Sequence, residues 1–340
     1  MFMTTFRALS LAALVAAGAV APAAAQDKVT FKISHGYPAS HFLIEQGVQK
    51  FADAVSAATG GAVAFELYPA NQLGKDHLAT VASGIAELAL VTPAIAGGKL
   101  PLTAVSELPG LANSSCEYSH KFWELAKEGG ILNEAEYKPQ DLHVIYVSTV
   151  PPYSMLTATR PTPTLDAVSG LKIRVAGGAM NKTVTALGGA PVQIPGPEMY
   201  DALTRGTVDG SLYSHMALAA LKLEDVMKYS TSGVKLGAGS VVLVMSAKAW
   251  DGLSDSARAA ITEAGAATLD AQCSWQDEQE ATATKRLVEE KGWEIAELSP
   301  EQVALWTERI ATVNEDWAKE LDGAGRPGTE VLNAFRAAAQ

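Results

Sequence analysis

The stretch GLKIRVAGGAMNKTVTALGGAPVQIPGPEMYDALTRGTVDGSLY, residues 170–213, indicates the fold. It opens with an alternating segment in which Leu171, Ile173 and Val175 share one face, as the side chains of a strand do. Helices and strands then alternate, bounded by glycine or proline: 179–187 (helix), 191–195 (strand), 198–205 (helix) and 208–213 (strand). A unit with this order and compactness predicts half of a parallel α/β sheet.

The beginning of the chain repeats this layout on other residues. Segments with strand patterns occur at 29–33, 63–67 and 88–91, and helical patterns separate them. Two similar α/β halves facing each other across a cleft are the natural inference. Further along, Gly239 to Ser246 is an unbroken apolar run typical of a strand buried on both faces. A helical pattern of unusual length covers Ser254 to Lys291.

Several polar side chains follow predicted strands, where open α/β sheets bind their ligands. Arg174 and Tyr213 lie at two such ends in the opening stretch, so they are the first candidates. The other residues that follow strands are Tyr37, Thr92 and Tyr153. If the three tyrosines converge, they form an aromatic wall suited to an apolar or cationic part of a ligand.

The first 25 residues read as a secretory signal peptide. Arg7 is their only charge, an apolar run follows, and Ala23 to Ala25 is a small-residue cleavage site. The mature chain is then expected to begin at Gln26 and to be soluble, because no later stretch has the roughly 20 apolar residues of a membrane span. Loss of Arg7 takes the net charge from −11 to −12. So acidic a protein is unsuited to binding nucleic acid or anionic lipid.

The chain has two cysteines, Cys116 and Cys273. An oxidising compartment permits a disulfide between them, whereas the alternative is two buried thiols. Sequence alone leaves both open, because it does not show whether the Cα atoms lie within about 7 Å.

Motifs for catalysis or metal binding do not occur in the sequence. It contains no Gly-x-Ser-x-Gly, His-Glu-x-x-His, Cys-x-x-Cys or phosphate-binding glycine loop. His35, His41 and His77 lack metal-ligand spacing and are interpreted as solvated or hydrogen-bonded loop residues. The sequence therefore predicts no enzyme, no cofactor and no metal-ligating residues, and it leaves open whether a metal ion accompanies a ligand.

Four stretches resemble one known family, the periplasmic solute-binding proteins of TRAP (tripartite ATP-independent periplasmic) transporters, which are DctP-like. The first stretch is Leu-Tyr-Pro-Ala-Asn-Gln-Leu-Gly-Lys-Asp at 67–76. The others are Arg160-Pro161 with Asp166 and Gly-Leu-Lys-Ile-Arg-Val at 170–175, then Glu-Met-Tyr-Asp-Ala-Leu at 198–203 with Val-Asp-Gly at 208–210, and the long helix at 254–291. Their order and spacing extend the resemblance over essentially the whole mature chain.

The resemblance implies a receptor that closes around a small organic acid and delivers it to a membrane permease. In this family an arginine at the position of Arg174 forms a bidentate pair with the ligand carboxylate, which suits the planar guanidinium. The chain departs from the family pattern at three positions. Tyr213 replaces an asparagine, Ser154 replaces a second arginine, and Ala176 replaces a proline.

The resulting expectation is a two-lobed periplasmic binding protein with a central interdomain cleft and a long helix spanning both lobes. We expect lobe I to comprise 26–151 and 239–275, and lobe II to comprise 152–238 and 276–335. The expected solute is a small carboxylate bound through Arg174, with Tyr213, Tyr153, Tyr37 and Thr92 around it. A zwitterion or amine held by the tyrosines is the alternative solute, and an exported enzyme is the alternative function. The protein is expected to be a periplasmic monomer. Arg160 is interpreted as a structural residue.

Overall fold

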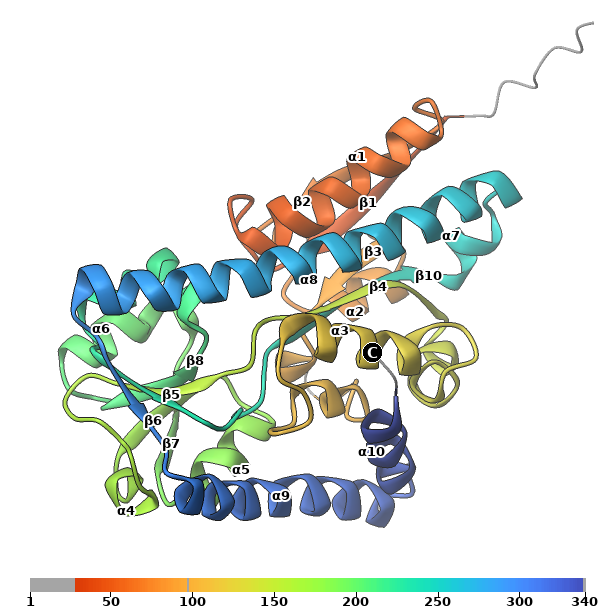
Figure 1. Ribbon diagram of the computed structural model, residues 1–340. Helices are drawn as coiled ribbons and strands as arrows, with labels where there is room; N and C mark the ends of the chain where they lie inside the picture. Colours follow the sequence, from red (N-terminus) through yellow and green to blue (C-terminus); the bar gives the residue numbers. More distant parts are fainter. Residues whose placement is uncertain (1–27, 97, 339–340) are drawn as a thin grey trace, which may run out of the picture.

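The structure, a computed structural model, describes residues 28–96 and 98–338. These residues form two α/β lobes, each built around one mixed sheet (Figure 1). The two-lobed fold expected from the sequence is therefore present. The signal peptide predicted at 1–25 lies outside the described residues. No helix in the described ranges combines the length and the apolar character needed to cross a membrane.

The described residues contain these strands: β1 (Val29–His35), β2 (Val63–Tyr68), β3 (Leu88–Val91), β4 (Leu142–Thr149), β5 (Ser154–Thr157), β6 (Lys172–Val175), β7 (Ala190–Gln193), β8 (Gly210–Tyr213), β9 (Tyr229–Ser232), β10 (Ser240–Ser246) and β11 (Glu294–Glu297). They contain these α-helices: α1 (Gln49–Ala58), α2 (His77–Ala82), α3 (Ser115–Ala126), α4 (Leu165–Val168), α5 (Ala179–Ala186), α6 (Met199–Thr204), α7 (Ala247–Asp251), α8 (Asp255–Lys291), α9 (Pro300–Gly323) and α10 (Gly328–Ala337).

Lobe I is built on a five-stranded sheet with the order β2-β1-β3-β10-β4. β1 pairs in parallel with both β2 and β3. Helix α1 is the crossover from β1 to β2, and α2 is the crossover from β2 to β3. β10 is inserted antiparallel between β3 and β4. The first six residues of β10 are all buried, which accounts for the unbroken apolar run in its sequence.

Lobe II is built on a six-stranded sheet with the order β11-β9-β5-β8-β6-β7. β6 pairs in parallel with β7 and β8, so residues 170–213 form the strand–helix–strand–helix–strand unit that the sequence predicts. β5 and β9 do not belong to that unit. β5 runs antiparallel to both β8 and β9 and extends the sheet toward β11.

Two extended segments connect the lobes, and they run side by side. Residues 150–153 lead from β4 to β5, and residues 233–239 lead from β9 back to β10. The two segments exchange backbone hydrogen bonds: Val150 N–H donates to Gly239 O at 2.8 Å, Tyr153 N–H to Gly237 O at 2.7 Å, and Leu236 N–H to Tyr153 O at 3.0 Å.

The 37-residue helix α8 extends along both lobes for about 55 Å (Figure 1). Ser254 caps its first turn by accepting a hydrogen bond from the Ala257 N–H, and Gly292 ends it with a positive φ of 66°. Gly265 is the one residue that disfavours a helix here. A Cβ at this position would lie 2.6 Å from the Ile145 carbonyl oxygen, so the glycine lets α8 lie directly on β4.

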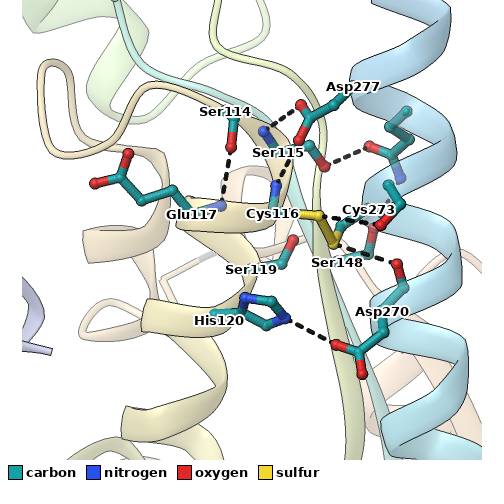
Figure 2. Close-up of a disulfide and its surroundings, with 12 residues drawn as sticks. Ser114, Ser115, Cys116, Glu117, Ser119, His120, Ser148, Asp270, Cys273 and Asp277 are labelled. Carbon is teal, nitrogen blue, oxygen red and sulfur yellow. Dashed lines mark hydrogen bonds and ion pairs between the residues drawn. A yellow bond between two sulfur atoms is a disulfide. The ribbon is translucent and has the colours of Figure 1, made fainter. Parts of the chain in front are cut away.

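A disulfide joins Cys116 in α3 to Cys273 in α8, with Cα atoms 4.7 Å apart (Figure 2). Asp277, one turn further along α8, accepts hydrogen bonds from the backbone N–H groups of Ser115 at 2.7 Å and Cys116 at 3.1 Å. A carboxylate at this place satisfies two free donors at the start of α3. The disulfide and Asp277 together fix the two helices to each other within lobe I.

Two segments near the end of the chain differ from the expectation. Residues 218–227 read as one helix in the sequence but form only short 3₁₀ turns, because Lys222 adopts a left-handed φ of 56° that interrupts them. α10 packs against the core of lobe I through Val331, Leu332 and Phe335. We therefore propose to assign α10 to lobe I rather than lobe II. The other lobe boundaries stay a prediction.

Candidate functional site

A cavity of about 180 Å³ lies between the lobes. All five residues predicted from strand ends line it: Tyr37, Thr92, Tyr153, Arg174 and Tyr213. Because lobe I supplies two of them, lobe II two, and the crossing segment Tyr153, the cavity spans the cleft. The structure thus brings together all the side chains that sequence reasoning selected.

A wider depression of about 740 Å³ lies between α8 and the crossing segments. Its wall contains Lys235, Asp277 and Glu280, and it is open to solvent. None of the five predicted residues lines it. We place the candidate site in the smaller cavity, because the strand ends and a buried arginine converge there.

Arg174 is the only arginine that lines this cavity, and it is 5% exposed. Its Nε–H donates to the Ile194 carbonyl oxygen at 2.8 Å, which fixes the guanidinium beside the loop that follows β7. Among the described residues no carboxylate pairs with it, and no hydrogen bond reaches its Nη atoms. Burial lowers the pKa of Arg174, while Tyr213 and Tyr153 raise it. A buried guanidinium with two free Nη groups is suited to a carboxylate.

The three tyrosines form one aromatic wall. The rings of Tyr153 and Tyr213 stack with centroids 6.0 Å apart and planes 14° apart. Tyr37 shares a 2.8 Å hydrogen bond with the Thr92 hydroxyl across the neighbouring part of the wall. Burial raises the pKa of Tyr37 to about 12 and raises those of Tyr153 and Tyr213, so all three are neutral phenols at ordinary pH.

The interpretation of the three histidines as solvated or hydrogen-bonded loop residues fits His41, whose Nδ1 accepts a hydrogen bond from the Leu43 N–H at 3.2 Å. His41 also lines the cavity and stacks on Tyr37 and Phe42, and burial lowers its pKa to about 4. His77 shares a 2.9 Å hydrogen bond with Ser34, but it begins helix α2 rather than lying in a loop. His35 is fully buried at the end of β1, and neither ring nitrogen has a hydrogen-bond partner among the described residues. Within the described ranges no group of three or more His, Cys, Asp or Glu could hold a metal ion.

Arg160 lies outside the cavity, as its structural interpretation requires. Its side chain is exposed, and Nη2 donates to the Ala167 carbonyl oxygen at 3.1 Å within lobe II.

Sequence reasoning missed Glu107, a carboxylate that also lines the cavity and is 4% exposed. It ends a 3₁₀ turn (Thr103–Glu107) in lobe I, and Ser240 Oγ donates to its Oε1 at 3.2 Å. No cationic side chain of the described residues pairs with it. Burial raises the pKa of Glu107 to about 7, against the opposing effect of hydrogen bonds from Ser240 and Ala94. The only sequence signal was a charged residue in the otherwise uncharged segment Leu102 to Leu108.

The raised pKa of Glu107 predicts how stability depends on pH. The folded protein binds this proton more tightly than the unfolded chain does, so the contribution of Glu107 to stability is greatest below pH 4.5 and falls as pH rises to about 7. The loss amounts to about 3 kcal/mol, at roughly 1.4 kcal/mol per pKa unit. Thermal unfolding of ligand-free Glu107→Gln should lack this decline. An identical pH profile in wild type and variant would exclude Glu107 as its source.

Comparison with known proteins is informative at this point. Residues 33–320 match the DctP family of bacterial extracellular solute-binding proteins, family 7. The chain belongs to this family. A curated member, the C4-dicarboxylate-binding periplasmic protein DctP of Rhodobacter capsulatus, is 27% identical over 336 residues, which cover 96% of this chain and 97% of the relative. The DctP family comprises transport proteins rather than enzymes.

Solved structures show the same fold. A TRAP periplasmic solute-binding protein from Bordetella bronchiseptica with bound (R)- and (S)-mandelate has a TM-score of 0.79 at 22% identity, covering 91% of this chain and 98% of that one. A TRAP solute-binding protein from a marine metagenome, specific for aromatic acid ligands and in complex with metahydroxyphenylacetate, has a TM-score of 0.81 at 22% identity, with the same coverage. These similarities show the two-lobed fold of this DctP-family chain.

Proposed function

We propose that this DctP-family protein is the extracytoplasmic receptor of a TRAP transporter and binds a small organic acid in the cavity between its lobes. The observation that carries the proposal is the buried Arg174, which has no anionic partner among the described residues and lines an interlobe cavity. A buried charge without a partner is costly, and a ligand carboxylate would remove that cost.

The size and composition of the cavity support a small solute. A space of about 180 Å³ between tyrosine rings suits a compact acid with an apolar body. The Rhodobacter relative is named for C4-dicarboxylates, and both solved relatives above carry aromatic carboxylates. Because the cavity has walls from both lobes, a bound acid contacts both and favours the closed form.

The alternative solute is a zwitterion or amine held by the tyrosines. Glu107 favours it in part, since a buried carboxylate attracts a cation. An amine without a carboxylate, however, would leave the guanidinium of Arg174 unpaired. We therefore retain the acid as the defining feature of the solute.

A thermal-shift screen of residues 26–340 tests this function. A ligand at 100 times its dissociation constant adds about 2.7 kcal/mol of stability, which raises Tm by several degrees. We expect shifts with small monocarboxylates, dicarboxylates or aromatic acids and none with sugars or simple amines. Shifts confined to amines would refute the role of Arg174, and turnover of a stabilising ligand would indicate an enzyme.

We further propose that the chain is cleaved after Ala25, resides in the periplasm and delivers its solute to a membrane permease. The family consists of extracellular solute-binding proteins, and the Rhodobacter relative is periplasmic by name. The monomeric state stays a prediction.

A further inference from the structure

Two opposite charges line the same cavity without pairing. Arg174 belongs to β6 of lobe II, whereas Glu107 belongs to the 3₁₀ turn of lobe I. No ion pair among the described residues joins them. Tyr153 is under the influence of both, because the pKa of its hydroxyl is raised by Glu107 and lowered by Arg174. The cavity is therefore cationic on one wall and anionic on the other, with tyrosine between.

The position of Glu107 is fixed by the crossing segment. Its carbonyl oxygen accepts a hydrogen bond from the Ala238 N–H at 3.3 Å. A Cβ on Gly237, whose φ is +99°, would lie 2.6 Å from that oxygen. Ser106 Oγ donates to Ser240 Oγ at 2.8 Å, and Ser240 donates onward to Glu107. Glu107 is thus held in place by Ser240 and the crossing segment, and its orientation does not depend on a ligand.

We propose that Glu107 determines specificity, and that the solute carries a hydrogen-bond donor, a hydroxyl or an ammonium group, at the end remote from its carboxylate. This inference rests on the proposed function, because it takes Arg174 as the site of the ligand carboxylate. A solute with this polarity satisfies both buried charges at once, and an acid without a donor leaves Glu107 unpaired. Hydrogen bonds to charged groups are the strong ones, and a buried acceptor left without one is penalised.

A purely structural role for Glu107 makes a different prediction. In that role the carboxylate would contact only the 3₁₀ turn and Ser240. Its replacement would then change the stability of the protein by the same amount whichever ligand is bound. Glu136 is a matched control, because it is also a buried glutamate of lobe I, at 2% exposure. It accepts hydrogen bonds from the backbone of Leu102 and Thr103 and does not line the cavity.

The test compares matched acids by calorimetric titration: butanoate with 4-aminobutanoate and 4-hydroxybutanoate, and phenylacetate with 3- and 4-hydroxyphenylacetate. In the wild type, at least one donor-bearing acid should bind 10-fold or more tightly than its unsubstituted match. Glu107→Gln should reduce that preference to less than 3-fold, and Glu136→Gln should preserve it. Equal affinity within every pair, or a preference that survives Glu107→Gln, overturns the inference.

The pH dependence gives a second readout that a structural role would not produce. Affinity for the preferred donor-bearing acid should rise between pH 6 and pH 8, since the free site must lose a proton from Glu107 before it accepts the donor. The other titratable groups that line the cavity are His41, Arg174 and the three tyrosines, and their pKa values lie outside that interval. In Glu107→Gln the affinity should be independent of pH over the same range.

The two proposals fail in distinguishable ways. If acids bind and Arg174→Ala abolishes binding while donors make no difference, the receptor function stands and the role of Glu107 is wrong. If no acid binds, the proposed function fails and the inference fails with it. If Arg174→Ala leaves acid binding intact, the receptor function stands, but the assignment of the carboxylate site fails and the inference fails with it. A preference for unsubstituted or keto acids would show instead that Glu107 acts as a protonated donor.

Discussion

Arg174→Ala should weaken binding of the acid ligand about 30-fold or more. The guanidinium is 5% exposed and has no anionic partner among the described residues, so the ligand carboxylate is the charge that compensates it. Truncating one member of a buried charge pair typically costs roughly 2–5 kcal/mol, because the other charge is left without a partner. Calorimetric titration of wild type and variant with the best acid from the thermal-shift screen measures the effect directly.

Two controls separate charge from geometry in this experiment. Arg174→Lys keeps a positive charge but loses the planar fork, and it should recover little of the lost affinity. Arg160→Ala removes an exposed arginine of the same lobe that lies outside the cavity, and it should bind like the wild type. Wild-type affinity in Arg174→Ala would sink the assignment of the carboxylate site.

Removing the disulfide should destabilise the protein strongly while leaving its affinity nearly unchanged. Cys116 and Cys273 are 157 positions apart in sequence, and a bridge that closes so long a loop restricts the unfolded chain considerably. The double variant Cys116→Ser/Cys273→Ser should therefore lose about 2–5 kcal/mol, which lowers Tm by about 3–8 °C. Thermal unfolding with and without reductant measures the loss.

The disulfide variant and Arg174→Ala serve as controls for each other. Neither cysteine lines the interlobe cavity, so the double serine variant should bind the acid within about 3-fold of the wild type at a temperature where it is folded. Arg174→Ala should keep the Tm of the ligand-free protein or raise it, since it removes a buried charge. A double variant with unchanged Tm, also under reductant, would argue against the bridge.

Much of the fold follows from regular sequence patterns. The 170–213 unit was predicted because its strands alternate apolar residues and its helices end at glycines. The long helix was predicted from its extended periodicity despite Gly265, whose presence only the contact with Ile145 explains. β5 and β9 were missed because neither alternates apolar and polar residues: β9 is Tyr-Ser-Thr-Ser, and the apolar residues of β5, Met155 and Leu156, are adjacent and both buried. Such strands are defined by their neighbours in the sheet rather than by their own sequence.

The candidate site, too, could be predicted from the sequence only in part. The five predicted residues lie at the ends of strands or in the segments that follow them, and the general rule for open sheets brings them together. Glu107 follows no strand, and the 3₁₀ turn that carries it has no periodic pattern in the sequence. Its place in the cavity depends on contacts with Ser240, which lies 133 positions further along the chain. Contacts at that separation are decided by packing and cannot be inferred from local pattern.

Two carboxylates one turn apart on α8 have a mechanical consequence. Asp277 holds the start of α3 in lobe I, and Glu280 accepts hydrogen bonds at 2.9 Å from the backbone N–H groups of His215 and Met216 in lobe II. Two positions on α8, three residues apart, are thus hydrogen-bonded to different lobes. We therefore expect a rotation that parts the lobes to bend this turn of α8 or to break one of the two sets of hydrogen bonds.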